Sequence, residues 1–201
     1  MNKYLGFYQL KALGLPAVPW RQFSEQTELD DRLLWTVRVA VIDSNDLNLP
    51  RFVGVGSMEA VAKGRELLDK YCGRGLVIYY PYFIAEKSGV LDISSSRTVI
   101  EAVDGDLWNL VTYGRKAVTI ISANGLNSLD TTEFHGDSGF LSQAEIDEIR
   151  KYSALFRGRF REDLSEGKSV FAEWSFAYNT DVGKKPIGDR YLVFYELRTV
   201  K

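Results

Sequence analysis

The chain has 201 residues, of which 45% are hydrophobic and 13% aromatic, enough to fill the core of one substantial domain or of two small lobes. This composition excludes a disordered chain, and a net charge of −2 with both signs interspersed argues against the basic surface of a nucleic-acid-binding protein. A single cysteine, Cys72, excludes an internal disulfide, and no apolar run reaches membrane-spanning length. We therefore expect a protein of a reducing compartment, the cytoplasm, that binds neither nucleic acid nor a membrane.

The first part of the chain indicates, in order, a helix, a buried strand, a loop or loose hairpin, and a second helix. Gly14 is placed to end the first helix, because glycine readily adopts the backbone conformation found at helix C-termini. The strand is apolar apart from one cation, Arg38, and Ser57 is expected to cap the second helix. The expected ranges are 3–13 for the first helix, 33–42 for the strand, 43–56 for the loop and 57–71 for the second helix.

The second part of the chain is dominated by strand patterns. Pro81 interrupts the first strand, and the AEKSG segment at 85–89 is expected to turn the chain into a hairpin. Ser142 and Glu145 have the spacing of a capping box, which predicts a helix running to about residue 164. The expected elements are strands at 76–84, 90–94, 98–103, 107–112 and 117–122, a polar mobile loop at 123–140, the helix, and closing strands at 171–177 and 191–198.

This order of elements predicts an α+β fold with mostly antiparallel sheets. We expect two lobes, residues 1–75 and residues 76–201, that meet at a cleft and form one functional unit. The sequence shows no internal repeat and no low-complexity tract.

Each closing strand carries a carboxylate within an apolar run: FAEWSFA contains Glu173, and YLVFYELR contains Glu196. Regular alternation places Glu196 and Arg198 on one face, together with Leu192 and Phe194. Because an unpaired charge inside a sheet costs several kcal/mol, such residues have a partner, a metal ion or an exposed cleft. Two carboxylates on neighbouring strands suit Mg²⁺ bound to a triphosphate. The alternative is a solvated sheet face that is only partly covered.

Several segments also resemble the nucleotide-binding domain of phosphoenolpyruvate synthase and pyruvate phosphate dikinase. In that family a lysine heads a helix that ends in a Gly- and Pro-containing segment, and KYLGFYQLKALGLPAVPWRQF is similar to this opening. The similar segments follow the family's order across nearly the whole chain. They are 3–23, WTVRVAVIDSNDLNLPR at 35–51, YYPYFIAEKSGVL at 79–91, VIEAVDGDLWNLVTYG at 99–114, and the closing FAEW and YELR.

The resemblance implies the ATP-grasp fold, in which two α+β lobes hold ATP between them. It maps the family's phosphate-binding lysine and arginine onto Lys3 and Arg38. A guanidinium inside an apolar strand needs an anion, and its planar fork suits phosphate oxygens. The alternative for Arg38 is a structural ion pair with Asp43, Asp46 or a sheet carboxylate, and the alternative for Lys3 is a solvated side chain.

The resemblance also places the adenine pocket at Tyr80, Pro81 and Tyr82. Pro81 has no N–H, so a backbone donor to the base must come from a neighbouring residue, or the aromatic rings stack on the base. Glu101 is implied to line the phosphate or ribose side of the cleft. The alternatives are tyrosines that pack in the core and a glutamate that faces water from an edge strand.

For the metal site, the family has Asp-x-Glu on the first closing strand and Gln on the second. In this chain Phe171 stands at the Asp position and Glu196 at the Gln position, so Glu173 and Glu196 remain as two anionic ligands for Mg²⁺. Arg198 clamps the γ-phosphate or pairs with Glu196. In this interpretation Arg38 and Arg198 act in catalysis by neutralising charge on the transferring phosphate.

Three other features have weak chemical signals. His135 is the only histidine and lies in a polar, Gly-rich stretch, and Cys72 has no base beside it in the sequence. The GVGSMEA segment at 54–60 resembles a phosphate loop but lacks its Gly-Lys-Ser/Thr ending. We assign none of these three to the site.

The leading hypothesis is a protein that binds ATP and Mg²⁺ and transfers a phosphoryl group to an unidentified small-molecule or protein acceptor. The domains that complete the reaction in the full dikinase enzymes have no counterpart here, so a partner protein or another acceptor is implied. The alternative is a non-catalytic nucleotide-binding or protein-interaction module of the same fold. A third hypothesis is a structural subunit or homo-oligomer whose aromatic sheet face is an interface.

Overall fold

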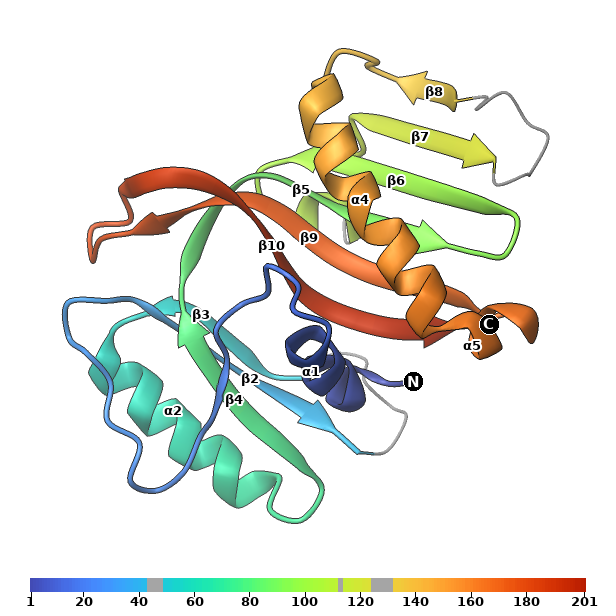
Figure 1. Ribbon diagram of the computed structural model, residues 1–201. Coiled ribbons are helices and arrows are strands. Elements are labelled where there is room, and N and C mark those ends of the chain that lie inside the picture. Colours follow the sequence, from blue (N-terminus) through green and yellow to red (C-terminus); the bar gives the residue numbers. More distant parts are fainter. Residues whose placement is uncertain (43–48, 112–113, 124–131) are drawn as a thin grey trace.

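The computed structural model describes residues 1–42, 49–111, 114–123 and 132–201, which form two antiparallel sheets with helices (Figure 1). The smaller sheet has four strands in the order β1-β4-β2-β3. The larger sheet has six strands in the order β10-β9-β5-β6-β7-β8. The predicted α+β class, with two lobes of antiparallel sheet, is confirmed.

The smaller sheet buries one face against helix α2 (Ser57–Lys70). Val37 and Val39 belong to the core beneath this helix, so Arg38 between them points to the opposite face. Ser57 is the first residue of α2 and Gly56 is its N-cap, which moves the predicted cap by one residue. The strands are β1 (Arg21–Gln22), β2 (Trp35–Val41), β3 (Arg51–Val55) and β4 (Gly75–Pro81).

The larger sheet is covered on one face by α4 (Gln143–Arg159) and the short α5 (Arg161–Ser165). The predicted capping box is present: the Ser142 side chain accepts from the Glu145 backbone, and the Glu145 side chain accepts from the Ser142 backbone. The predicted single helix is divided at Phe160. The strands are β5 (Phe83–Ile93), β6 (Arg97–Asp104), β7 (Val118–Ala123), β8 (Thr132–Gly136), β9 (Ser169–Thr180) and β10 (Pro186–Val200).

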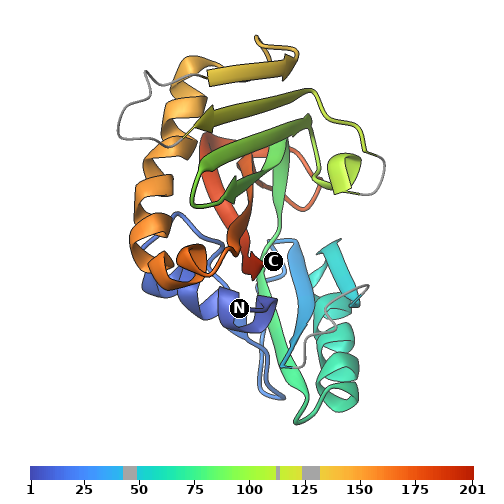
Figure 2. The same cartoon turned by 90° about the vertical axis from the view of Figure 1, so that its right-hand side faces the viewer.

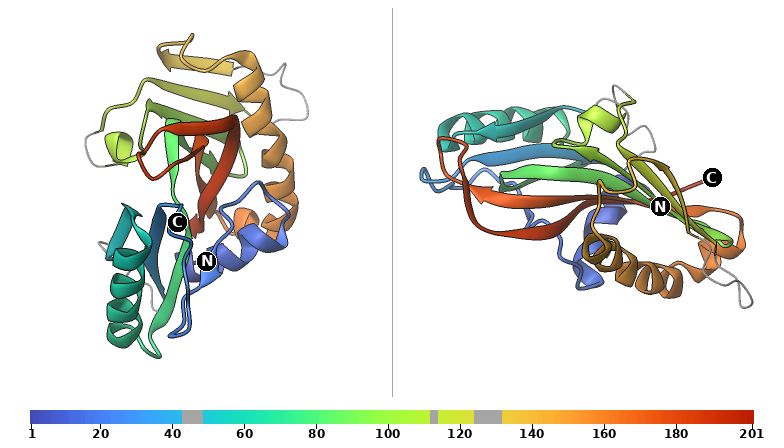
Figure 3. Two further views of the ribbon diagram at one scale, coloured as in Figure 1. Left: turned by 90° about the vertical axis from the view of Figure 1, so that its left-hand side faces the viewer. Right: turned by 90° about the horizontal axis from the view of Figure 1, so that it is seen from above.

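Helix α1 (Lys3–Ala12) lies at the junction of the two lobes, where both ends of the chain meet (Figure 2). Gly6 approaches β10 so closely that a Cβ there would lie 1.8 Å from the carbonyl oxygen of Leu197. Phe7 of this helix shares a core with Ile78 of β4 and with residues of the larger lobe. A continuous core therefore joins the lobes, while α2 and α4 lie on opposite sides of the molecule (Figure 3).

The turn predicted at 85–89 is wrong, because β5 runs through it without interruption. Its residues pair with β6 on one side and β9 on the other, and Gly89 lies opposite both Ala102 and Trp174. A Cβ at Gly89 would lie 2.1 Å from the Glu101 carbonyl oxygen. The glycine that suggested a turn is thus required by close packing in the middle of the sheet.

The strand predicted at 107–112 is also wrong. The described part of this segment contains the short helix α3 (Trp108–Val111), which begins where the Asp106 side chain accepts a hydrogen bond from the Trp108 N–H. Part of the loop predicted at 123–140 is the strand β8, and residues 124–131 lie outside the described residues.

The chain passes from the smaller to the larger sheet at Tyr82, between β4 and β5. A division of the chain at residue 75 stays a prediction. Among the described residues, no helix combines the length and apolar character needed to cross a membrane.

Candidate functional site

A β-bulge in β10 sets the direction of the two closing-strand glutamates. Phe194 lies opposite Trp174, whereas Glu196 lies opposite Glu173, so β10 carries one extra residue, Tyr195, at this point. Since cross-strand partners share a face and successive residues alternate, Glu196 and Glu173 lie on the same face. Phe194 and Trp174 lie on the other face.

This bulge corrects part of the alternation expected from the sequence. Glu196 and Arg198 do share a face, as predicted, but Leu192 and Phe194 lie on the opposite one. The ring of Phe194 packs against Phe156 of α4, with ring centroids 5.9 Å apart. The extra residue reverses the alternation within the strand, so a purely periodic pattern assigned the apolar residues to the wrong side.

The face not covered by α4, which we call the open face, carries a row of side chains across the larger sheet that are polar except for Val90. Each residue of this row lies directly opposite the next one on the neighbouring strand. It consists of Glu196, Glu173, Val90, Glu101, Thr119 and His135. Three of the sequence-predicted site residues are therefore on one face of one sheet, on β10, β9 and β6.

Cations from the other side of the junction meet this row at Glu196. Lys3 at the start of α1 places Nζ 3.0 Å from Glu196 Oε1, and Arg38 of β2 donates from Nη2 to Glu196 Oε2 at 3.0 Å. Arg198 places Nε 4.0 Å from Glu196 Oε1. The Glu196 side chain is only 2% exposed. We call Lys3, Arg38, Glu173, Glu196 and Arg198 the interlobe charge cluster.

Arg38 points toward the cluster because its neighbours in β2, Val37 and Val39, are buried on the opposite face in the core beneath α2. The guanidinium lies 5.4 Å from the centre of the Phe7 ring and is almost entirely buried. Its anion in the structure is Glu196, which is the sheet carboxylate that the sequence left open as an alternative to phosphate. Asp43 and Asp46, the other candidate partners, lie outside the described residues.

The two glutamates of the cluster have opposite electrostatic behaviour. Burial raises the pKa of Glu173 to about 8, and the negative charge of Glu196 adds to this rise. Burial also disfavours the charge of Glu196, but Arg38 and Lys3 outweigh it and lower the Glu196 pKa. At neutral pH the cluster thus holds three cations against one firmly ionised carboxylate, so it carries an excess of positive charge.

Of the two predicted adenine-pocket tyrosines, Tyr80 lies beside this cluster. Tyr80 is buried, its hydroxyl lies within hydrogen-bonding reach of Arg38, and burial raises its pKa. Tyr82 is half-buried, and its backbone N–H already donates to the Leu34 carbonyl at 2.8 Å. The Tyr82 ring lies 5.9 Å from the ammonium of Lys184. Of the two tyrosines, only Tyr82 has a ring that is partly accessible.

A contact that sequence reasoning missed connects the lobes next to this site. The Arg51 guanidinium of β3 stacks on the ring of Trp108 in α3, with Cζ 4.2 Å from the ring centre. Trp108 is 47% exposed. The signal available in the sequence was a tryptophan within the turn-rich DGDLWNL segment.

Glu101 lies farther along the row, at a small cavity of about 260 Å³. Its Oε1 atom is 2.9 Å from Lys116 Nζ and accepts from the Thr119 hydroxyl at 3.3 Å. Val90 and Phe171 form part of the apolar lining of this cavity. Glu101 is therefore on the same face as the cluster but is separated from Glu173 by Val90.

The three features that we did not assign to the site lie outside the interlobe charge cluster. His135 ends the row on β8, where Nε2 lies 3.8 Å from a carboxylate oxygen of the exposed Glu133. Cys72 is exposed. The GVGSMEA segment spans the end of β3 and the start of α2. Within the described parts of the chain, no group of three or more His, Cys, Asp or Glu side chains is arranged to hold a metal ion.

Comparisons with known proteins give little further guidance. No protein-family model matches the chain, and no curated protein matches it. Among solved structures, the D-alanine–D-alanine ligase of Bacillus anthracis is similar over 99% of this chain, with a TM-score of 0.48 and 10% sequence identity. The similar region spans 56% of that ligase chain, so this chain corresponds to about half of its length.

Proposed function

We propose that the protein binds ATP with Mg²⁺ between its lobes and supports transfer of a phosphoryl group from ATP to an unidentified acceptor. The observation that carries this proposal is the convergence of three cations and two carboxylates, drawn from both lobes, at one point. A triphosphate requires cations from the protein and oxygen ligands for its metal. The resemblance to the dikinase nucleotide-binding domain supports the same proposal.

In this proposal Lys3, Arg38 and Arg198 neutralise the phosphates. The bound nucleotide takes over part of the role that Glu196 now has as counter-ion of Lys3 and Arg38. Arg38 is preorganised, because its guanidinium is fixed by Glu196 and by the ring of Phe7. Preorganised cations stabilise charge on a transferring phosphoryl group without reorganising during the reaction.

The carboxylates fit a magnesium ion by their chemistry. Both are hard oxygen donors, and within the described residues the Glu173 carboxyl makes no ion pair and no hydrogen bond of its own. When bound, the metal would supply Lewis-acid chemistry that withdraws charge from the transferring phosphoryl group. Glu173 and Glu196 would hold it, and Glu173 would have to lose its proton to do so.

The remaining residues are assigned to the base and the sugar. Tyr82 would contact adenine through its ring, since its N–H is already bonded within the protein. Tyr80 would act through Arg38, which its hydroxyl approaches. Glu101 would accept hydrogen bonds from the ribose.

A second candidate is a non-catalytic module with the same fold. Both oxygens of Glu196 are already paired with cations, so the cluster can connect the lobes without any ligand. A partner protein or a second copy of the chain would then be the binding partner. This candidate retains the buried ion pairs and predicts no turnover.

Thermal unfolding with and without Mg-ATP separates these candidates. A ligand at 100 times its Kd stabilises the folded state by about 2.7 kcal/mol, so the melting temperature should rise. Arg198→Gln should reduce this rise, whereas Arg65→Gln on the exposed face of α2 should leave it unchanged. Release of ADP or AMP would support phosphoryl transfer, and a rise without release would support the binding module. No rise at millimolar Mg-ATP would refute nucleotide binding.

A further inference from the structure

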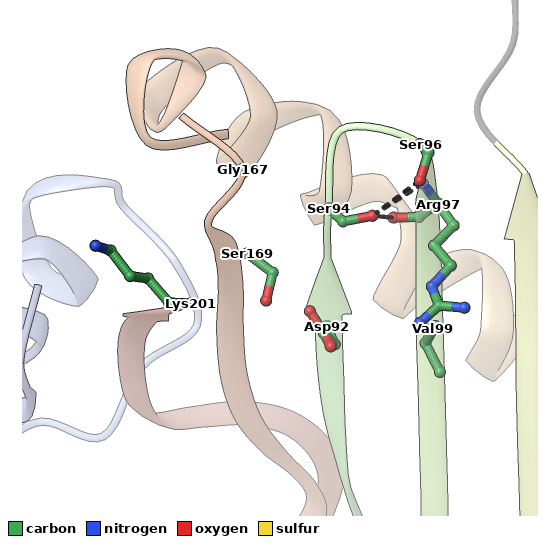
Figure 4. A pocket seen from close by; sticks show the side chains of 8 residues that line it. All are labelled: Asp92, Ser94, Ser96, Arg97, Val99, Gly167, Ser169 and Lys201. Carbon is green, nitrogen blue, oxygen red and sulfur yellow. Dashed lines mark hydrogen bonds between the residues drawn. The ribbon is translucent and has the colours of Figure 1, made fainter. Parts of the chain in front are cut away.

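A second cavity, with a mostly polar lining, lies on the open face beside the interlobe charge cluster, and Figure 4 shows the residues that line it. In the ladders Asp92 lies opposite Phe171, and Phe171 lies opposite Arg198. The cavity has a volume of about 330 Å³. Its polar lining consists of Asp92, Ser94, Ser96, Arg97, Ser169 and Lys201. Phe171 thus lies between Asp92 of this cavity and Arg198 of the interlobe charge cluster, and the Arg198 guanidinium is 4.8 Å from the centre of its ring.

Asp92 gives the cavity a site for a cation. Its Oδ1 atom is closed off from solvent and accepts no hydrogen bond within the described residues. Figure 4 shows the carboxylate on β5 next to the Ser169 side chain of β9. A carboxylate with one dehydrated, unbonded oxygen gains more from a cationic partner than a fully hydrated carboxylate does.

Arg97 supplies a charge of the opposite sign. Its side chain runs along Val99, which is the ladder partner of Asp92 (Figure 4). Arg97 is exposed and, in the part of the chain that the structure describes, makes no ion pair. A guanidinium in this position suits a carboxylate, which it can bind with two hydrogen bonds. The amino group of Lys201 points away from Asp92 in Figure 4, so we assign the anion to Arg97.

The rim of the cavity is held in place from the opposite face of the sheet. Arg157 of α4 donates to the Ser94 carbonyl at 2.7 Å and to the Thr98 hydroxyl at 2.9 Å. The Ser94 N–H also donates to the Arg97 carbonyl at 2.9 Å. A rim that is already ordered loses little entropy when a ligand binds.

We propose that this cavity binds a small zwitterion, with its primary amine on Asp92 and its carboxylate on Arg97. The cavity volume is at the lower end of the range for small-molecule sites, which fits a ligand of about amino-acid size. This binding does not rest on the proposed function.

The test uses the full chain without nucleotide. The ligands are a series of amino acids in which the number of methylene groups between the amine and the carboxylate increases. The probes are glycine, β-alanine, 4-aminobutanoate and 5-aminopentanoate, with butylamine and butanoate as single-charge controls, and calorimetry measures their binding. We expect at least one zwitterion to bind more tightly than both controls. Asp92→Asn and Arg97→Gln should each weaken that binding about 10-fold or more. Asp104→Asn, at an exposed position elsewhere on β6, should leave it unchanged.

Asp92→Asn is nearly isosteric and removes the charge of a half-buried carboxylate whose Oδ1 atom accepts no hydrogen bond within the described residues, so it should melt no lower than the wild-type chain. Absence of binding by every zwitterion at millimolar concentration would overturn the proposal, as would equal binding by wild type and Asp92→Asn. A chain that binds Mg-ATP but no zwitterion overturns this inference alone. A chain that binds a zwitterion but no Mg-ATP overturns the proposed function and leaves the cavity assignment intact.

Discussion

Raising the pH should destabilise the protein through Glu173, and Glu173→Gln should remove this effect. The folded state keeps the Glu173 proton to about pH 8, whereas the unfolded chain releases it near pH 4.5. Between these values the folded state binds more protons than the unfolded state. Stability is therefore lost as the pH rises through this window, and the loss is complete above the folded pKa.

The magnitude follows from the width of this window. A tenfold change in proton affinity is worth about 1.4 kcal/mol, so a rise in pKa from 4.5 to about 8 corresponds to at most about 5 kcal/mol. Glu173 is only half-buried, and solvent screening reduces this figure. We expect an observed effect of roughly 2–4 kcal/mol.

The assay is urea unfolding of the wild-type chain and of Glu173→Gln at several pH values from about 5 to about 9. The difference in the free energy of unfolding should be small at the acidic end and should increase in favour of Glu173→Gln as the pH rises. Glu59→Gln on α2 is a matched control at an exposed site, and its difference from wild type should not follow this trend. A Glu173→Gln difference that is constant with pH, or a wild-type chain that is the more stable at alkaline pH, would refute the reasoning.

Two further substitutions test how the lobes are joined. Glu196→Gln should lower the free energy of unfolding by roughly 3–5 kcal/mol, because it leaves the buried Arg38 guanidinium without its counter-charge; an unchanged urea midpoint would contradict this pairing. Gly6→Ala should lower the melting temperature, because the added methyl group would lie 1.8 Å from the Leu197 carbonyl oxygen and force α1 away from β10. Its cost should be about 1–3 kcal/mol. Gly158→Ala in α4 is the control, since no atom lies within 4 Å of the added Cβ, and a comparable loss in that variant would show that α1 packing is not the cause.

Local patterns in the sequence were sufficient where neighbouring residues decide the structure. The capping box at Ser142 and Glu145 needs only a short spacing, and the apolar run around Arg38 needs only periodicity. The apolar runs of the closing strands also singled out Glu173 and Glu196, of which Glu196 is paired with Lys3 and Arg38. These features depend on side chains that are close in sequence, so the sequence by itself determined them.

Only the tertiary structure decided which charges meet and which face they share. Arg38 and Glu196 are 158 positions apart, and their ion pair exists because β2 and β10 come together at the junction of the lobes. The bulge at Tyr195 turns Glu196 toward Glu173 and away from Phe194. β5 passes through a turn-like segment because strands bond to it on both sides. Strand register and charge pairing are set by long-range hydrogen bonds and packing, which a local pattern does not contain.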